Sequence, residues 1–452
     1  MTIRNFLNSI QDLYPFHMPG HKRNLNYVGA YCEADITEIH GADNLLEPDG
    51  IIRGLQDNLA DLYGARESFI LVNGSTVGIE AAVLYLGPVP VIMARNSHRS
   101  AYSGLIISAG APKYIYPEIT ADNIAGATTP QNVEHALNTN PDAAAVFITS
   151  PTFEGYCSDI GQIAQIVHNH NKLLIVDEAH GAHFGFHPAF PKNASRMGAD
   201  IVIQSLHKTL PAPGQCSLMH ISGRLADAKK LKACINILQT SSPSYFFMAE
   251  IERCAQMLRD DGTRLFEEYY DRLIWFRREA TGLKGIRLLS DTGDPGKLTF
   301  CMDGNLNGIE FGRQLRERGV ELEMCLPTHT VAMTSIADTD DGFRRLRDAV
   351  FEIDRNLGVV RHGGGSLQHG GAPQLSPRDA FFSNKCIVAL KDAEGMIAGD
   401  FVIPYPPGVP LIVPGEKVTG EIIKDVDRLR AAGADVLGSD RIAVILERRE
   451  IC

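Results

Sequence analysis

The chain has 452 residues, of which 44% are hydrophobic and 21% charged, as in ordinary folded globular proteins. This composition excludes a disordered or fibrous chain and provides enough apolar material for large cores. Lys and Arg number 43 against 54 Asp and Glu, a formal net charge of −11. An acidic balance argues against nucleic acid or an anionic membrane surface as the main partner.

The cysteines and the N-terminus point to a cytoplasmic protein. The 9 cysteines are scattered, with no CxxC pair and no Cys/His cluster at zinc spacing, so we expect reduced thiols and no metal site. The first stretch, MTIRNFLNSIQDLYPF, contains Asp12 and lacks the apolar run of a signal peptide. No stretch reaches the roughly 18 apolar residues that cross a bilayer.

The order of apolar runs predicts an α/β fold. Residues 15–23 (PFHMPGHKR) are rich in turn formers and are predicted to be a loop. From residue 68, short apolar runs alternate with amphipathic helices, which is typical of a parallel sheet covered on both faces. The predicted strands are 68–72, 89–94, 143–149, 173–176 and 201–204, with a helix at 159–171. Ligands of such sheets bind beyond the carboxyl ends of the strands.

Changes in pattern divide the chain into consecutive predicted parts. They are an N-terminal segment (1–60), a large domain (61–283) ending in a long helix (264–283), a small α/β domain (284–360), a linker (361–375) and a C-terminal domain (376–452) with a proline-stiffened loop (404–416) and a helix (417–432). The linker is rich in Gly and His. A metal site at His362 and His369 is an alternative, but a solvated linker fits that composition better.

The first informative strand end is LVNGSTVG (71–78), where a strand leads through Gly74 into a helix. Backbone N–H groups at the helix N-terminus, with the hydroxyls of Ser75 and Thr76, form a cradle suited to phosphate. The alternative is that these hydroxyls only cap the helix.

The second is IVDEAHGAH (175–183), where Asp177 ends an apolar strand. Burial of a carboxylate is costly unless it has a cationic partner, although Asp177 could also accept backbone N–H groups of the following turn. His180 and His183 suggest zinc, but without a third ligand a hydrogen-bonded or stacking role is favoured.

The third is VIQSLHKTLPAP (202–213), which places Lys208 just beyond a strand, at the sheet edge expected for Asp177. A desolvated lysine can condense with a carbonyl, whereas a lone loop lysine normally faces solvent. Together, a lysine, a buried acid and a phosphate cradle are what pyridoxal phosphate requires, for its aldehyde, its ring nitrogen and its phosphate.

The chain resembles the pyridoxal-phosphate-dependent Orn/Lys/Arg decarboxylase family in its short form, without a receiver-like wing domain before PFHMPGHKR. The resemblance implies an aspartate-aminotransferase-like fold (PLP fold type I) with a mainly parallel sheet, and a homodimer with active sites at the subunit interface. Family decamers are not expected without the wing. The matching stretches, in family order, are PFHMPGHKR, DITEIHGADNLLEPDGII, LVNGSTVGIEAA, RNSHRSAY, TSPTFEGYCSDI, VDEAHGAHFGFHPAFP, GADIVIQSLHKTLPA, SSPSY and PYPPGVPLIVPGE.

The resemblance also implies roles for individual residues. Lys208 forms the imine and Asp177 faces the ring nitrogen, while His98 and Ala179 lie on opposite faces of the ring and His180 contacts the cofactor. Ser75, Thr76, Ser205 and His207 hold the phosphate, and Thr240 or Ser241 reaches the phosphate of the neighbouring subunit. Asp43 and Glu416 are candidate contacts to the basic end of the substrate. PAPGQCS (211–217) departs from the family pattern after Lys208.

The implied reaction converts a basic amino acid to its amine and CO2 through a Lys208 aldimine and a quinonoid, with His207 or Lys208 returning the proton to Cα. Arginine is favoured, before lysine or ornithine, because short relatives without the wing are often arginine decarboxylases of polyamine biosynthesis; this is an analogy. An aminotransferase or another Cα-lyase on the same fold is the nearest alternative. A non-catalytic regulatory homologue is a further one.

Overall fold

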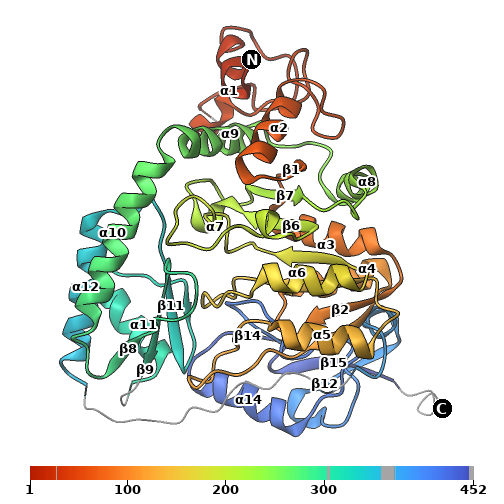
Figure 1. Cartoon of the computed structure of the whole chain (residues 1–452), viewed down its shortest axis with the longest axis vertical. Helices are drawn as coiled ribbons and strands as arrows, with labels where there is room; N and C mark the ends of the chain where they lie inside the picture. The colour runs from red at the N-terminus through yellow and green to blue at the C-terminus, as the bar shows by residue number, and fades with distance from the viewer. Residues whose placement is uncertain (27, 303–305, 358–370, 372, 447–452) are drawn as a thin grey trace. The chain divides into compact units, whose positions relative to one another are not determined.

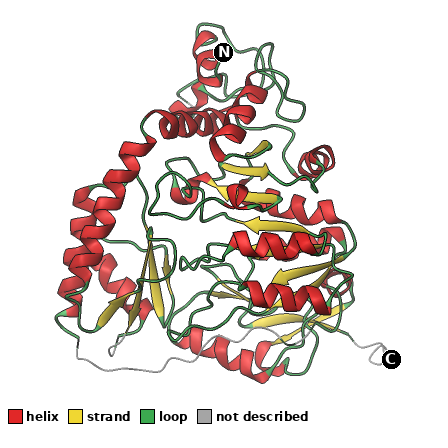
Figure 2. Ribbon diagram, in the orientation of Figure 1, coloured by secondary structure: helices red, strands yellow, loops and turns green. Residues whose placement is uncertain are grey.

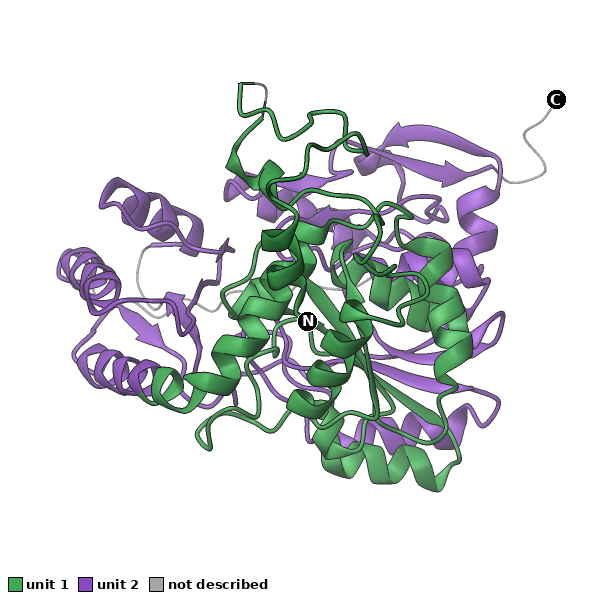
Figure 3. Ribbon diagram, turned by 90° about the horizontal axis from the view of Figure 1, so that it is seen from above, with its two compact units in different colours: residues 1–85, 160–267 green, residues 86–159, 268–452 purple. Residues whose placement is uncertain are grey.

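The structure is a computed structural model of the chain, and it describes residues 1–26, 28–302, 306–357, 371 and 373–446. The chain forms two compact units, coloured in Figure 3. Unit 1 comprises residues 1–85 and 160–267, and unit 2 comprises residues 86–159 and 268–452. Figures 1 and 2 show the elements of both.

Unit 1 contains strands in the order β1-β7-β6-β5. Their bounds are β1 (Glu67–Leu71), β5 (Leu173–Asp177), β6 (Ile201–Ser205) and β7 (Ser217–Ile221). β5 and β6 run parallel, whereas β7 is antiparallel to both β6 and β1. The predicted parallel arrangement is therefore confirmed for β5 and β6, and β1 runs in the same direction as both, because β7 is the antiparallel strand between β1 and β6.

The helices of unit 1 begin and end where local chemistry requires. They are α1 (Ile3–Ser9), η1 (Ala30–Glu33), α2 (Ile51–Tyr63), α3 (Gly74–Leu86), α6 (Ile160–Asn169), η2 (Ala194–Met197), α7 (Leu206–Thr209), α8 (Ala228–Leu238), α9 (Tyr245–Asp260) and the start of α10 (Gly262–Ala280). The amphipathic α2 buries Leu55, Leu59 and Tyr63, and it stops at Gly64, whose φ of 69° suits glycine.

Helix α3 covers one face of the unit 1 strands. A Cβ on Gly78 would meet Leu71 Cδ1 at 2.6 Å, Ile203 Cγ2 at 3.1 Å and Met219 Cε at 3.5 Å. The glycine thus permits the helix to lie against β1, β6 and β7. On the other face, the ring of Tyr63 from α2 lies 4.7 Å from that of His220.

Unit 2 contains a parallel set in which β2 lies between β3 and β4, and a four-stranded set in the order β10-β11-β9-β8. Its strands are β2 (Pro90–Ala94), β3 (Ala111–Ile115), β4 (Ala145–Thr149), β8 (Ile286–Leu288), β9 (Lys297–Met302), β10 (Met324–Cys325), β11 (His329–Met333), β12 (Lys385–Ala389), β13 (Ile403–Pro404), β14 (Val436–Leu437) and β15 (Arg441–Ile445). Its helices are α4 (Arg99–Ser108), α5 (Pro130–Thr139), α11 (Gly308–Glu317), α12 (Asp340–Asp354), α13 (Pro377–Phe382), η3 (Leu390–Asp392) and α14 (Gly420–Ala431).

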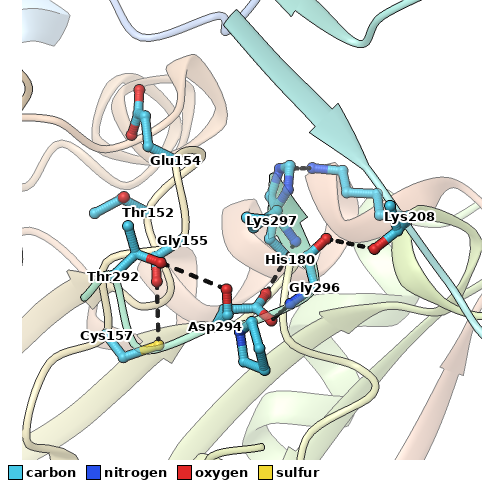
Figure 4. Close-up of polar contacts among 12 residues, drawn as sticks. Thr152, Glu154, Gly155, Cys157, His180, Lys208, Thr292, Asp294, Gly296 and Lys297 are labelled. Carbon is cyan, nitrogen blue, oxygen red and sulfur yellow. Dashed lines mark hydrogen bonds and ion pairs between the residues drawn. The ribbon is translucent and has the colours of Figure 1, made fainter. Parts of the chain in front are cut away.

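The stretch after β4 is tied to the four-stranded set of unit 2. Cys157 N–H donates to Thr292 O over 2.9 Å, and Asp294 N–H donates to Gly155 O over 3.1 Å. Lys297 Nζ lies 3.2 Å from Asp294 Oδ2 in a buried ion pair, which Figure 4 draws. These contacts hold the TSPTFEG segment against the start of β9.

The predicted strands all form, with ends shifted by one or two residues. β3 and β7 were not predicted from the sequence. The five-part domain division stays a prediction, and most of its linker, including His362 and His369, lies outside the described residues.

Candidate active site

The carboxyl ends of β5 and β6 bring two predicted residues to one edge. Asp177 is the last residue of β5, and Lys208 lies in α7, the single turn that follows β6. Because the two strands are parallel neighbours, both ends lie at the same edge. Asp177 is only 3% exposed, and its Oδ1 accepts the Ala179 N–H over 3.1 Å.

The lysine amine has an imidazole partner that the sequence did not predict. Lys208 Nζ lies 3.0 Å from His180 Nε2, as Figure 4 shows. One of the two nitrogens must donate, so a Lys208 ammonium would donate to a neutral imidazole. Burial raises the pKa of Asp177, and the nearby Lys208 charge and the Ala179 N–H partly oppose that rise.

His207 is fixed by Cys216, the residue just before β7. Its Nδ1 lies 3.0 Å from the Cys216 carbonyl oxygen, which can only accept, so Nδ1 carries the proton and donates. Burial lowers the pKa of His207, as does the Lys208 charge, while the Cys216 carbonyl opposes the change. His207 is therefore a neutral ring whose Nε2 is an acceptor.

The predicted anion cradle lies at the N-terminus of α3. Gly74 has a φ of 76° and turns the chain into the helix, so Ser75 and Thr76 occupy its first turn. The N–H groups of that turn have no partner within a helix and suit an anion. Gly74 N–H donates to Gln215 O over 3.0 Å, which ties the cradle to the loop after Lys208.

Two serines supply further hydroxyls at the carboxyl edge of β6. Ser205 and Ser217 are paired across β6 and β7, and both are fully buried. Among the described residues, neither Oγ has a hydrogen-bond partner. Ser205 was predicted. Ser217 was missed, because only the antiparallel pairing with β7 brings it opposite Ser205.

Two other predicted cofactor residues of unit 1, Ala179 and Thr240, are hydrogen-bonded to segments of the same site. The Ala179 carbonyl accepts the Ser205 N–H over 3.3 Å. Thr240 N–H donates to Asn73 Oδ1 over 3.0 Å, next to Gly74. Thr240 therefore lies beside the cradle of its own chain.

His98 belongs to unit 2, where it caps α4. Its ring accepts the Ser100 N–H at Nδ1 over 3.3 Å. A Cβ on Gly408 would lie 3.1 Å from the His98 ring, so the PYPPG loop packs directly against it. The stacking role of His98 stays a prediction.

The structure gives Glu416 a partner other than substrate. Both oxygens of this fully buried carboxylate bind Arg95, at 2.8 Å from Nε and at 2.8 Å from an Nη, and one also accepts the Val413 N–H. Glu416 is thus part of a structural ion pair.

Asp43, the other candidate for substrate contact, caps a helix. Its Oδ2 accepts the N–H groups of Gly50 and Ile52, over 2.9 and 2.8 Å, at the start of α2. Burial raises the pKa of Asp43, but several backbone donors outweigh that effect and lower it overall. We therefore leave Asp43 and Glu416 out of the proposed substrate site.

His183 lies among aromatic rings, 4.7 Å from the ring of Phe184 and 5.3 Å from that of Phe190. Within the described ranges, no group of three His, Cys, Asp or Glu side chains is arranged to hold a metal ion.

An amine beside an imidazole, a buried acid and an anion cradle can bind an aldehyde cofactor that carries a phosphate. Solved structures share the fold of this chain. The constitutive lysine decarboxylase of E. coli superposes with a TM-score of 0.82 at 20% identity, covering 98% of this chain and 82% of that one. Serine palmitoyltransferase of Sphingomonas wittichii gives 0.57 at 13% identity, covering 68% of this chain and 77% of that one. The fold is aspartate-aminotransferase-like, PLP fold type I, as predicted.

Comparison of the sequence with known families and proteins identifies the family within this fold. The Orn/Lys/Arg decarboxylase major domain matches residues 9–299, and the C-terminal domain of that family matches residues 368–435. Arginine decarboxylase of Bacillus subtilis is 30% identical over 96% of this chain and 95% of its own length. Constitutive lysine decarboxylase of Escherichia coli is 23% identical over 90% and 74%. The chain belongs to the Orn/Lys/Arg decarboxylase family and is a carboxy-lyase, which confirms the predicted resemblance.

Proposed function

We propose that this chain is a pyridoxal-phosphate-dependent decarboxylase of a basic amino acid, with arginine preferred to lysine or ornithine. The observation that carries the proposal is the Lys208 amine, 3.0 Å from His180 Nε2, near a buried Asp177. Arginine is preferred because the relatives named arginine decarboxylase match at 29–30% identity, against 23% for one named lysine decarboxylase.

The residues present fit pyridoxal phosphate. The phosphate requires hydrogen-bond donors, and the fully buried Ser205 Oγ has no partner among the described residues. The first turn of α3 supplies further backbone N–H groups. When bound, this cofactor links its aldehyde to amines and takes up the electron pair left at Cα as CO2 departs.

We assign holding roles to residues of this site. Those for the phosphate are Ser75, Thr76, Ser205 and His207, with Thr240, which lies beside the cradle of its own chain. Those for the ring are Asp177, Ala179, His180 and His98. Asp177 would hold the ring nitrogen of the bound cofactor. A charge pair at about 4 Å contributes roughly 4 kcal/mol at an effective dielectric near 20, so the Asp177 carboxylate would favour the protonated form of that nitrogen.

Lys208 and its neighbours handle protons. His180 Nε2 accepts a proton from the Lys208 ammonium, which leaves a neutral, nucleophilic amine. The proton held on His180 then passes back to the Lys208 amine, which donates it to Cα of the product. His207 is the second candidate for that step; because its Nε2 is an unprotonated acceptor, it would first have to take up a proton and then donate it to Cα.

The proposal includes a homodimer with shared active sites, a cytoplasmic location and a small-molecule amino acid as substrate. Among the described residues, no helix has the length and hydropathy to cross a membrane.

A substrate panel tests the reaction. The purified protein with pyridoxal phosphate is incubated with arginine, lysine or ornithine, and CO2, amine and oxo-acid are measured. We expect CO2 and the amine of arginine. Oxo-acid without CO2 would instead identify an aminotransferase, and no product from any of the three would contradict the proposal.

Replacement of the lysine tests the site. Lys208→Ala should abolish the absorbance of the lysine-linked cofactor and stop turnover, because no other amine is proposed to bind the aldehyde. Lys192→Ala, at an exposed position of unit 1, is the matched control and should change neither. Borohydride reduction of wild type, followed by peptide mapping, should label Lys208. A label on another lysine would reject the assignment.

A further inference from the structure

A row of polar side chains crosses the strands of unit 1. Ser68 Oγ on β1 lies 2.7 Å from His220 Nδ1 on β7. His220 Nε2 lies 3.1 Å from Gln204 Oε1 on β6, and Gln204 Nε2 lies 2.6 Å from Glu178 Oε2, just beyond β5. Consecutive hydrogen bonds thus join neighbouring strands from one side of unit 1 to the other.

The row is closed to solvent. Gln204 and His220 are fully buried, Glu178 is 2% exposed, and Tyr63 of α2 packs on the His220 ring. A buried polar group costs free energy unless it is hydrogen-bonded. Apolar side chains would fill this face of the sheet without the cost of burying polar groups. Packing alone therefore does not explain why polar side chains stand here.

Each polar atom of the row has a partner, and the hydrogen bonds can run in either direction. Glu178 Oε1 accepts the Ala194 N–H over 2.9 Å, in addition to its contact with Gln204. With a carboxylate at Glu178, donation runs from Ser68 through His220 and Gln204 towards Glu178. If the Gln204 amide is flipped and Glu178 is protonated, the same chain runs in reverse.

The row ends behind the proposed cofactor residues. Glu178 follows Asp177 in the chain, and Gln204 precedes Ser205. Successive side chains of a strand point to opposite faces, so Asp177 and Ser205 share the face opposite the row. The Glu178 N–H donates to Ile203 O over 2.9 Å, which keeps this alternation to the end of β5.

We propose that Glu178, Gln204 and His220 are positioning residues that fix Asp177 and Ser205 for the cofactor. The Gln204–Glu178 hydrogen bond couples the ends of β5 and β6 from behind. It thereby sets the spacing between the acid that faces the ring nitrogen and the hydroxyl that holds the phosphate. This inference rests on the proposed function, because it concerns the cofactor named there.

Burial raises the pKa of both carboxylates, but the Lys208 charge opposes that rise only at Asp177. Burial raises the pKa of Glu178 to about 8, although the Gln204 and Ala194 hydrogen bonds oppose the rise, and the Asp177 charge adds to it. A neutral Glu178 leaves Asp177 as the negative charge nearest the ring nitrogen.

The competing explanation is that the row only stabilises the fold. In that case, cutting the row lowers the unfolding temperature but leaves the bound cofactor unchanged. The positioning role instead predicts a change in the cofactor itself. Cofactor affinity, the visible circular dichroism of the bound cofactor, and kcat and KM distinguish the two.

The test uses Gln204→Met, which removes both hydrogen bonds of Gln204 but nearly preserves its shape. Gln56→Met is the matched control, since Gln56 is a buried glutamine of α2, 5% exposed, outside the row. We expect Gln204→Met to weaken pyridoxal phosphate binding about tenfold or more, to reduce the visible circular dichroism, and to lower kcat more than it changes KM. Gln56→Met should match wild type in these readouts.

Two variants of Glu178 complete the experiment. Glu178→Gln can donate to a flipped Gln204 amide and still accept the Ala194 N–H, because an amide both donates and accepts. Its cofactor affinity and its kcat should therefore stay within about twofold of wild type. Glu178→Leu should behave as Gln204→Met does. If Gln204→Met and Glu178→Leu bind cofactor as Gln56→Met does, the positioning role is rejected. It is also rejected if neither folds while Gln56→Met does, since the row would then be structural. A wild type that binds no pyridoxal phosphate would instead refute the proposed function.

Discussion

Arg95 and Glu416 form a fully buried ion pair whose partners lie far apart in the chain. The guanidinium binds both carboxylate oxygens and also donates to the carbonyls of Pro410 and Leu411. Removing one partner of such a pair leaves an uncompensated buried charge, which costs about 3–5 kcal/mol. The pair therefore fixes the 410–416 segment to the end of β2.

Glu416→Gln is expected to lower the free energy of unfolding by about 3–5 kcal/mol and to leave KM for the amino acid unchanged in the protein that remains folded. Denaturant unfolding and steady-state kinetics measure the two effects. Glu310→Gln is the control, because Glu310 pairs with Arg313 at the surface, where such pairs contribute at most about 1 kcal/mol. A large increase in KM without lost stability would restore Glu416 as a substrate contact.

The buried His220 makes the stability of the fold depend on pH in the acid range. Burial lowers the pKa of His220 to about 3, against an ordinary 6.5. The unfolded chain therefore binds a proton as pH falls below 6.5, while the folded chain does not, and stability is lost at up to about 1.4 kcal/mol per pH unit. Glu178, whose pKa is raised from 4.5 to about 8, has the opposite slope: its contribution is complete below pH 4.5 and is lost as pH rises to 8.

We therefore predict a difference between wild type and His220→Gln that depends on pH. The variant cannot titrate at this position, so wild type should lose stability relative to it by about 1.4 kcal/mol per unit from pH 6.5 to 4. Urea unfolding at a series of pH values measures the difference. His135→Gln, at an exposed helical position, should run parallel to wild type. A parallel His220→Gln profile would mean that His220 is charged in the fold.

At the residue scale, the sequence predicted those site residues that lie at the end of an apolar strand or just beyond it. Asp177, Ser205 and Lys208 follow apolar strands, and the structure brings them to one edge. The His180–Lys208 contact and the partner of Glu416 depend on segments distant in sequence. A sequence shows that a charge is present, but it does not show which group neutralises it.

At the scale of elements, continuous apolar runs were predictable and polar strands were not. β3 (Ala111–Ile115) includes Pro112 and Lys113, which weaken a strand signal. β7 (Ser217–Ile221) contains the buried His220, which a sequence reading takes as polar. Because β7 was missed, the antiparallel pairing of β1 and the position of Ser217 were missed as well.

Helix α11 shows a close approach that only glycine permits. A Cβ on Gly308 would overlap Leu326 O and lie 2.9 Å from His329 O. These are backbone atoms, which cannot turn away, so the helix start lies directly on the turn between β10 and β11.

Gly308→Ala is therefore expected to destabilise the protein by about 1–3 kcal/mol. Gly342→Ala, in the first turn of α12, is the matched control, because its new Cβ would find Thr339 Oγ1 at 3.6 Å and nothing nearer. That control should be neutral or should stabilise by about 0.5–1 kcal/mol, since alanine is the better helix former. Thermal unfolding compares them. Equal effects of the two substitutions would show that helix α11 can shift away from the turn.

At the scale of the whole molecule, the N-terminal segment of unit 1 leaves large apolar side chains uncovered. Phe16 is 90% exposed and Tyr14 is 71% exposed, and their rings lie 4.9 Å apart. Leu13, Met18, Leu25 and Tyr31 are also among the exposed large hydrophobic residues. Scattered apolar residues are ordinary on a surface, but a concentration of them within one short segment indicates a protein contact. A second copy of the chain is the partner that the proposed homodimer supplies.

We predict that the wild type sediments as a dimer and that the double variant Tyr14→Ser, Phe16→Ser shifts it towards monomer. Polar side chains at these positions remove apolar area that association would bury, at roughly 25 cal/mol per Å2. Ile237→Ser is the control, because Ile237 is 72% exposed on α8, outside this segment, and it should leave the dimer intact. If the active sites are shared between subunits, the decarboxylase activity per mole of protein should fall as the double variant is diluted. The control should keep its activity per mole of protein on dilution. A monomeric wild type with full activity would contradict both the interface and the sharing of sites.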